Sequence, residues 1–175
     1  SAAADVYKRQ IYNGLDFSHV VPKTDRAAYF AQFGYTVHEG DVIAGIAARL
    51  DPVKDIPTLI RAVALAKKAC PQLRLAIAGD GKERKKLEAL TKELGLADSV
   101  FFLGWVNDLD SFYGALDINT LSSLSEAFPY ALPEGARAHL ATVASNVGGV
   151  PAIIEHGVTG LLIEPGDVRM LAAYL

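Results

Sequence analysis

The sequence is poor in sulfur and histidine: its 175 residues include one cysteine, one methionine and four histidines. The lone cysteine, Cys70, cannot form a disulfide within the chain and has no cysteine companions for a metal site, so we expect a reducing, cytoplasmic setting. His19, His38, His139 and His156 stand singly, without ligand spacing or a nucleophile motif. We therefore predict structural roles for them.

Long apolar runs and blocks of like charge are also missing. Lysine and arginine total 17 against 20 acidic residues, a net charge of -3, and the basic residues are scattered. Without a basic patch we expect no nucleic-acid partner. No apolar run approaches the roughly 20 residues that cross a bilayer, and residues 1–10 lack the apolar core of a signal peptide. Any membrane association of the complete protein is then peripheral, at the inner face of the membrane.

From Val42 onward, short runs of valine, isoleucine and leucine alternate with segments of helical periodicity, which predicts βαβ units. The predicted strands are Val42–Ala48, Leu73–Ala78, Val100–Leu103, Ile118–Leu121, Thr142–Ser145 and Gly160–Ile163. The predicted helices are Ile56–Cys70, Lys82–Leu94, Asp110–Leu116, Leu132–Ala138 and a last one capped by Asp167. The fold class is therefore α/β, a Rossmann-like three-layer α/β/α domain with a mostly parallel sheet.

The chain divides into two parts at about residue 40. Residues 1–40, with the turn dipeptide Asn13-Gly14 and no sustained period, are predicted to be an N-terminal extension and an inter-domain connector. Residues 41–175 form the α/β domain. Because the last predicted helix is still running at Leu175, we expect the domain to be truncated at its C-terminal end.

Ligands of open parallel sheets bind beyond the carboxyl ends of the strands, so a binding site is expected in the loops that follow the strands. The first carries Arg49 and Lys54 beside a helix N-terminus, which suits a diphosphate, although pairing with surface carboxylates would explain both cations equally well. Gly148 and Gly149, after the fifth strand, either bring backbone close to an anion or form a plain turn.

The loop after the fourth strand is the richest in candidate groups. Glu126 and Glu134 lie eight positions apart, so they can touch the two ends of an extended ligand, such as sugar hydroxyls and ribose hydroxyls. Backbone N–H groups after Glu126 would face its phosphates. The alternative is that both glutamates are solvent-exposed and act only on helix-terminus electrostatics. Pro133 predicts a helix that starts at Leu132 and not at Pro129, because proline is tolerated in a first turn.

Three other signals favour structural roles. Gly79 and Gly81 open a helix, but Arg84 occupies the third position of a dinucleotide fingerprint, so we predict a tight turn. The acidic triplet ending at Asp110 is explained by an N-cap at Asn107 or Asp108, and we predict no metal site. Trp105 either stacks on a base or packs at the edge of the core, and we expect the second.

Taken in order, these loops resemble the C-terminal domain of retaining glycosyltransferases of the GT-B architecture, known as family 4 or group 1. The residues that carry the resemblance are Asn13-Gly14-Leu15-Asp16, Gly45 with Arg49 and Lys54, Ala78-Gly79-Asp80-Gly81, Phe102-Leu103-Gly104, Ser125-Glu126-Ala127-Phe128-Pro129 with Glu134, Ala144-Ser145-Asn146-Val147-Gly148-Gly149-Val150-Pro151, and Gly157-Val158-Thr159-Gly160 with Pro165. No single motif is specific, but the ordered set is.

The resemblance implies a domain that binds a nucleoside-diphosphate sugar without a metal cofactor. The implied donor-binding residues are Arg49 and Lys54 for the diphosphate, Glu134 for the ribose, and catalytic Glu126 with the Ala127 and Phe128 amides for the sugar and β-phosphate. Gly148 and Gly149 are candidates for phosphate or sugar contacts. The complete enzyme would transfer the sugar with retention, in envelope or extracellular polysaccharide assembly.

That enzyme would need an N-terminal acceptor-binding domain, which this sequence lacks, so we expect the chain alone to be inactive. The main alternative is a catalytically inactive nucleotide-binding or assembly module with the same fold. A sugar-nucleotide epimerase is a third interpretation, which the paired glutamates disfavour. Departures from the family pattern are Asp55, where a glycine is common, and Arg137, His139 and Ala141, where a small residue, glycine and proline are usual.

Overall fold

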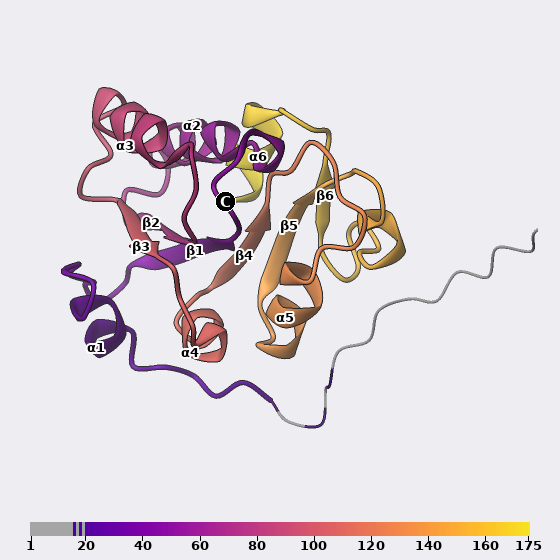
Figure 1. Ribbon diagram of the computed structural model, residues 1–175, viewed down its shortest axis with the longest axis horizontal. Coiled ribbons are helices and arrows are strands. Elements are labelled where there is room, and N and C mark those ends of the chain that lie inside the picture. The colour runs from indigo at the N-terminus through magenta and orange to yellow at the C-terminus, as the bar shows by residue number, and fades with distance from the viewer. Residues whose placement is uncertain (1–15, 17, 19) are drawn as a thin grey trace, which may run out of the picture.

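The computed structural model describes residues 16, 18 and 20–175 (Figure 1). The predictions for residues 1–10 and for Asn13-Gly14 lie outside these residues. Among the described residues, none of the helices combines the length and apolarity that a bilayer span requires.

The described strands form one six-stranded sheet of order β3-β2-β1-β4-β5-β6, in which every pair is parallel. The strands are β1 Val42–Ala47, β2 Leu73–Ala78, β3 Val100–Gly104, β4 Ile118–Leu121, β5 Ala141–Ser145 and β6 Leu161–Ile163. The strand order confirms the predicted Rossmann-like class. Because the order reverses between β1 and β4, the loops after these two strands diverge and leave a crevice at their carboxyl ends.

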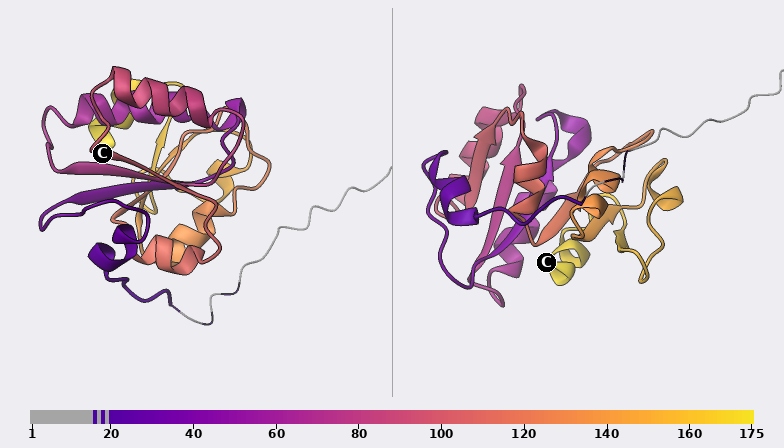
Figure 2. Two further views of the ribbon diagram at one scale, coloured as in Figure 1. Left: turned by 60° about the vertical axis from the view of Figure 1, so that its left-hand side comes forward. Right: turned by 90° about the horizontal axis from the view of Figure 1, so that it is seen from below.

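Helices cover both faces of the sheet, which is seen edge-on between them in Figure 2. The helices on one face are α2 Ile56–Ala66, α3 Arg84–Glu93 and α6 Val168–Tyr174, and those on the other are α1 Arg26–Ala31, α4 Leu109–Gly114 and α5 Ala131–Arg137. The two sheet faces have separate cores. Leu75 of β2 packs toward α2, whereas its neighbour Ala76 packs toward α4, because successive side chains of a strand point to opposite faces.

Helix α1 was not predicted, because six residues are too few for a helical period to be recognised. Asp25 caps it by accepting a hydrogen bond from the Ala28 N–H, and Phe30 is completely buried. Just after it, the ring of Tyr35 stacks on Phe101 of β3 with centroids 4.5 Å apart. Part of the segment predicted as a connector therefore packs against the α/β domain.

Two of the four departures from the family pattern fall at unusual backbone conformations. Asp55 and His139 have φ angles of 43° and 56°, the left-handed region that favours glycine, and they are the non-glycine residues in the described part of the chain with positive φ. Each occupies a position where the family usually has glycine. Helix α5 begins at Ala131, one residue before the predicted Leu132, and Pro133 lies in its first turn, where proline is tolerated.

Candidate functional site

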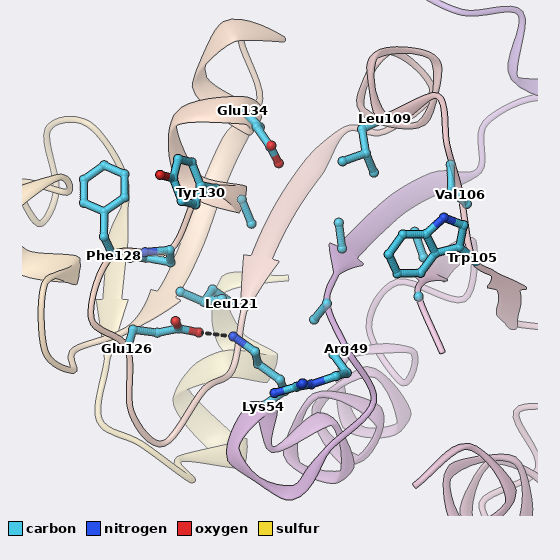
Figure 3. Close-up of a pocket in the computed structure, with 16 residues that line it drawn as sticks. Arg49, Lys54, Trp105, Val106, Leu109, Leu121, Glu126, Phe128, Tyr130 and Glu134 are labelled. Atoms are coloured by element: carbon cyan, nitrogen blue, oxygen red, sulfur yellow. Dashed lines mark hydrogen bonds and ion pairs between the residues drawn. The ribbon is translucent and has the colours of Figure 1, made fainter. Parts of the chain in front are cut away.

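A cavity of about 350 Å³ lies at the carboxyl ends of the central strands (Figure 3). The four charged residues singled out in the sequence all line it: Arg49 and Lys54 from the loop after β1, Glu126 from the loop after β4, and Glu134 from α5. These residues are far apart in the chain and are brought together because parallel strands end at one edge of the sheet. The convergence on which the donor-site prediction depends is present.

Lys54 and Glu126 form an ion pair across the cavity, with Nζ 2.6 Å from Oε1. Both side chains are mostly buried, at 22% and 9% exposed. The Ser123 hydroxyl donates to the same Glu126 oxygen at 2.6 Å. The loops that carry the pair are joined as well, since the Leu124 N–H donates to the Val53 carbonyl at 2.8 Å. The Glu126 carboxylate is therefore held at one oxygen by two donors.

Arg49 is the more exposed of the two cations, with 79% of its side chain exposed. Its Nε donates to the Asp51 carboxylate at 2.8 Å. The pairing with carboxylates that was the alternative interpretation is thus present for both cations. Both partners of the Lys54 pair line the cavity, whereas Asp51, the partner of Arg49, does not. Either cation can exchange a carboxylate oxygen for a phosphate oxygen without leaving the cavity.

Glu134 is anchored from inside the protein. The Tyr113 hydroxyl donates to its Oε2 at 3.0 Å. Burial raises the pKa of Glu134, and the hydrogen bond from Tyr113 and the charge of Arg137 oppose that increase. Arg137 in turn pairs with Asp110, which faces Glu134 from α4 and adds to the increase in its pKa. The charged form of Glu134 is therefore less favourable than that of an exposed glutamate.

The loop after Glu126 presents backbone donors. Within the described part of the chain, no group accepts a hydrogen bond from the Ala127 or Phe128 N–H. Gly148 and Gly149 lie behind this loop and do not line the cavity. The Gly149 N–H donates to the Glu126 carbonyl at 3.2 Å, and a Cβ at Gly148 would overlap that carbonyl oxygen. These glycines let the two loops touch, and their direct contact with a phosphate or sugar stays a prediction.

Gly79 and Gly81 have the same kind of role. A Cβ at Gly79 would overlap the Ala48 carbonyl oxygen, and one at Gly81 would meet that of Leu50. The tight turn predicted for them brings the loops after β1 and β2 into backbone contact, which shapes the floor of the cavity beside Gly79.

The expectation that Trp105 packs at the edge of the core is wrong. The side chain is 77% exposed, lines the cavity (Figure 3), and is held by a hydrogen bond of 2.9 Å from its Nε1 to Asn107 Oδ1. It follows a glycine with φ 71°, Gly104, which turns the chain away from the sheet. Asp108 caps α4 as predicted, accepting from the Ser111 N–H at 3.0 Å. No three histidine, cysteine or acidic side chains group as metal ligands in the described ranges.

Two residues of the site were missed in the sequence. Ser123 stands three positions before Glu126, so the two residues are neighbours in one loop and their contact is local in the sequence. Tyr113 is not a neighbour of Glu134 in the sequence. It lies 21 positions before Glu134 and has the helical spacing of a core residue.

The strand order and a ligand-sized cavity at the point where it reverses define a Rossmann-like α/β domain with a candidate binding site at the strand ends. The family model "Glycosyl transferases group 1" matches residues 30–175. The chain belongs to that family.

Individual relatives agree with this assignment. The chain is 38% identical over 95% of its length to the lipopolysaccharide core biosynthesis glycosyltransferase LpsD of Rhizobium meliloti. Its fold matches Anabaena Alr3699/HepE, crystallised with UDP and glucose, with a TM-score of 0.81 and 31% identity over 93% of this chain and 45% of that one.

A further match is the C-terminal domain of LpcC, a glycosyl transferase group 1 family protein from Francisella tularensis. The TM-score is 0.78 at 26% identity, over 91% of this chain and 85% of that domain. The chain spans 13% to 46% of the length of the curated relatives compared with it. It corresponds to the C-terminal part of a GT-B glycosyltransferase.

Proposed function

We propose that this chain is the donor-binding domain of a retaining glycosyltransferase and that its cavity holds a nucleoside-diphosphate sugar. The observation that carries the proposal is the convergence of Arg49, Lys54, Glu126 and Glu134 on one cavity. Two cations and two carboxylates line the cavity, together with Phe128, whose N–H has no acceptor among the described residues. These groups match a ligand with a charged centre and hydroxyl groups at both ends. The UDP and glucose bound by HepE support this ligand class.

The diphosphate lies between Arg49, Lys54 and the amides of Ala127 and Phe128. As donor enters, Lys54 exchanges the Glu126 carboxylate for a phosphate oxygen. When the glycosidic bond breaks, negative charge accumulates on the departing diphosphate, and cations and fixed N–H dipoles oriented toward it lower the barrier without a metal. The site thus supplies charge stabilisation with groups that are already in place.

Glu126 acts at the sugar. Once Lys54 has moved to the phosphate, the Ser123 hydroxyl still holds one carboxylate oxygen. The other oxygen faces the donor sugar, where a carboxylate can bind a hydroxyl and tolerate the positive charge that develops on the ring. At the other end of the donor, Glu134 binds the ribose hydroxyls and the exposed ring of Trp105 stacks on the base.

Transfer requires a further domain. In the complete enzyme an N-terminal acceptor-binding domain closes over the cavity and excludes water from it. The full protein works at the cytoplasmic side of the membrane, in assembly of a cell-envelope or extracellular polysaccharide, a role that the lipopolysaccharide relative supports.

Calorimetry against a panel of nucleoside diphosphates tests donor binding by the chain. We expect at least one diphosphate to bind, and Lys54→Met to weaken its affinity roughly 10- to 100-fold, the range of a lost charge-assisted hydrogen bond. The matched control is Lys86→Met, which removes the same charge from the far side of α3, where Lys86 is 76% exposed and pairs with Glu83. This control should leave the affinity unchanged.

Two results would contradict the proposal. One is a folded chain that binds none of the diphosphates at millimolar concentration. The other is an equal loss of affinity in the Lys54 and Lys86 variants, which would mean that net charge and not the site attracts the nucleotide.

A further inference from the structure

A tyrosine hydroxyl at the bottom of the site is unusually well fixed. Tyr113 is 1% exposed, and its ring packs edge-on against Phe112 with centroids 5.4 Å apart. The helix that carries it, α4, is tied to the segment before α1, where Thr24 bonds to the Gly114 and Ser111 carbonyls. The hydroxyl therefore has little freedom to follow a moving partner.

The hydrogen bond from the Tyr113 hydroxyl makes the two carboxylate oxygens of Glu134 different. Oε2 accepts the bond from Tyr113 at 3.0 Å, whereas no described residue donates to Oε1. Glu134 lines the cavity, and its carboxylate extends from α5 toward the side on which Leu109 lies (Figure 3). One oxygen is thus committed to the protein interior and the other is left for a ligand.

We propose that Tyr113 is a positioning residue for donor recognition, whose hydroxyl holds the Glu134 carboxylate so that Oε1 meets the paired 2′ and 3′ hydroxyls of the ribose. The inference rests on the proposed donor site. A glutamate that is free to rotate would lose rotamer freedom on binding, which opposes binding. Fixing the carboxylate in advance from a rigid core residue removes much of this cost.

Substitution of Tyr113 by phenylalanine removes the hydroxyl and keeps the ring. The probes are uridine diphosphate, or the tightest-binding diphosphate of the panel, and its 2′,3′-dideoxy analogue. We expect Tyr113→Phe to weaken the ribonucleotide about tenfold and to leave the affinity for the dideoxy analogue unchanged. The difference between the two probes isolates the contact with the ribose hydroxyls.

Tyr29 provides the matched control. It is also a buried tyrosine, 6% exposed, but its hydroxyl has no hydrogen-bond partner among the described residues. Tyr29→Phe therefore deletes the same atom from the same kind of environment without touching Glu134. Both probes should bind this variant as they bind the unmodified chain.

The pH dependence gives a second readout that a packing role would not change. The groups that face Glu134 are Tyr113 and Asp110 from α4 and Arg137 from its own helix. Because the Tyr113 bond lowers the pKa of Glu134, removal of the hydroxyl raises that pKa further. As pH falls, ribonucleotide affinity relative to the dideoxy analogue should then begin to decline at a higher pH in Tyr113→Phe than in the unmodified chain.

The possible results separate the two proposals. If the unmodified chain binds no nucleoside diphosphate, the donor site and this inference both fail. If it binds, but Tyr113→Phe weakens neither probe or weakens both equally, the donor site stands and the positioning role is wrong. Folding of each variant is checked by its thermal unfolding transition.

Discussion

At the scale of single residues, the two acidic groups of the site share one arrangement. Ser123 holds one oxygen of Glu126, and Tyr113 holds one oxygen of Glu134. Both residues are buried, at 0% and 1% exposed, and the hydroxyl of each donates to the carboxylate. Each glutamate therefore keeps one oxygen available to a ligand while its orientation is set by the fold.

Keeping Glu134 ready for a ligand should lower the stability of the folded chain. Its pKa is raised by burial, so the folded state binds its proton more tightly than the unfolded state does. The stabilisation from this residue is complete below the ordinary glutamate pKa and is lost as pH rises through the raised value. Glu134→Gln, which has no charge to bury, should therefore be as stable as the unmodified chain or more stable near neutral pH, by about 1 kcal/mol at most.

Urea unfolding of both proteins between about pH 4 and pH 7 measures this difference. The unmodified chain should lose stability relative to the glutamine variant as pH rises. A relative gain with rising pH would mean that the charged carboxylate is stabilised by its neighbours, contrary to the direction of the pKa shift. In calorimetry the same variant should bind the nucleoside diphosphate more weakly.

At the scale of elements, α3 and α5 end in the same way. In each, the third residue past the helix donates back into the last turn: Leu96 to the Thr91 carbonyl and Leu140 to the Gly135 carbonyl. The residue just before each leucine has positive φ, 69° for Gly95 and 56° for His139. This is the Schellman arrangement, and glycine is the residue that adopts it without steric strain.

His139→Gly should therefore stabilise the chain by about 1 kcal/mol, because a side chain in the left-handed region costs roughly 1 to 2 kcal/mol, part of which glycine offsets by its greater freedom when unfolded. Gly95→Ala makes the reverse kind of change at the equivalent position after α3, because it replaces a glycine of positive φ by a residue with a side chain. No atom lies within 4 Å of the added Cβ, so it should destabilise by about 1 kcal/mol through φ alone. Chemical denaturation measures both, and a less stable His139→Gly variant would contradict the argument.

The sequence predicted most elements and their order, because buried parallel strands are continuous apolar runs that stand out from amphipathic helices. It also predicted that Arg49, Lys54, Glu126 and Glu134 lie at one edge of the sheet, because the carboxyl ends of parallel strands meet there in any loop conformation. It could not show which of these groups bond to one another, because that depends on loop geometry. The same limit explains why Tyr113 and the exposure of Trp105 were missed.

At the scale of the whole molecule, loops from separate strands touch through glycines around the cavity. Gly148, after β5, supports the Glu126 loop after β4, although it does not itself line the cavity. Gly79, after β2, does the same for the loop after β1. The site is therefore sensitive to substitutions outside its own surface.

Gly148→Ala should weaken nucleoside diphosphate binding at least tenfold, because the new Cβ displaces the Glu126 carbonyl and with it the carboxylate. Gly157→Ala is the matched control: its φ of 78° imposes similar backbone strain, but nothing lies within 4 Å of the added atom. Both variants should lose stability, and only the first should lose affinity in calorimetry. Equal affinities for the two variants would show that the loops are not coupled.

The hydroxyl of Tyr35 has a consequence for how the molecule behaves at high concentration. It accepts a hydrogen bond of 2.9 Å from the Phe102 N–H and donates to the Phe102 carbonyl, so the outward-facing backbone groups in the middle of β3 are already occupied. An outer strand with unoccupied groups is a template on which a second chain can add its own strand. A single phenol, placed from a segment that precedes the sheet, thus protects this border of the domain against intermolecular β-pairing.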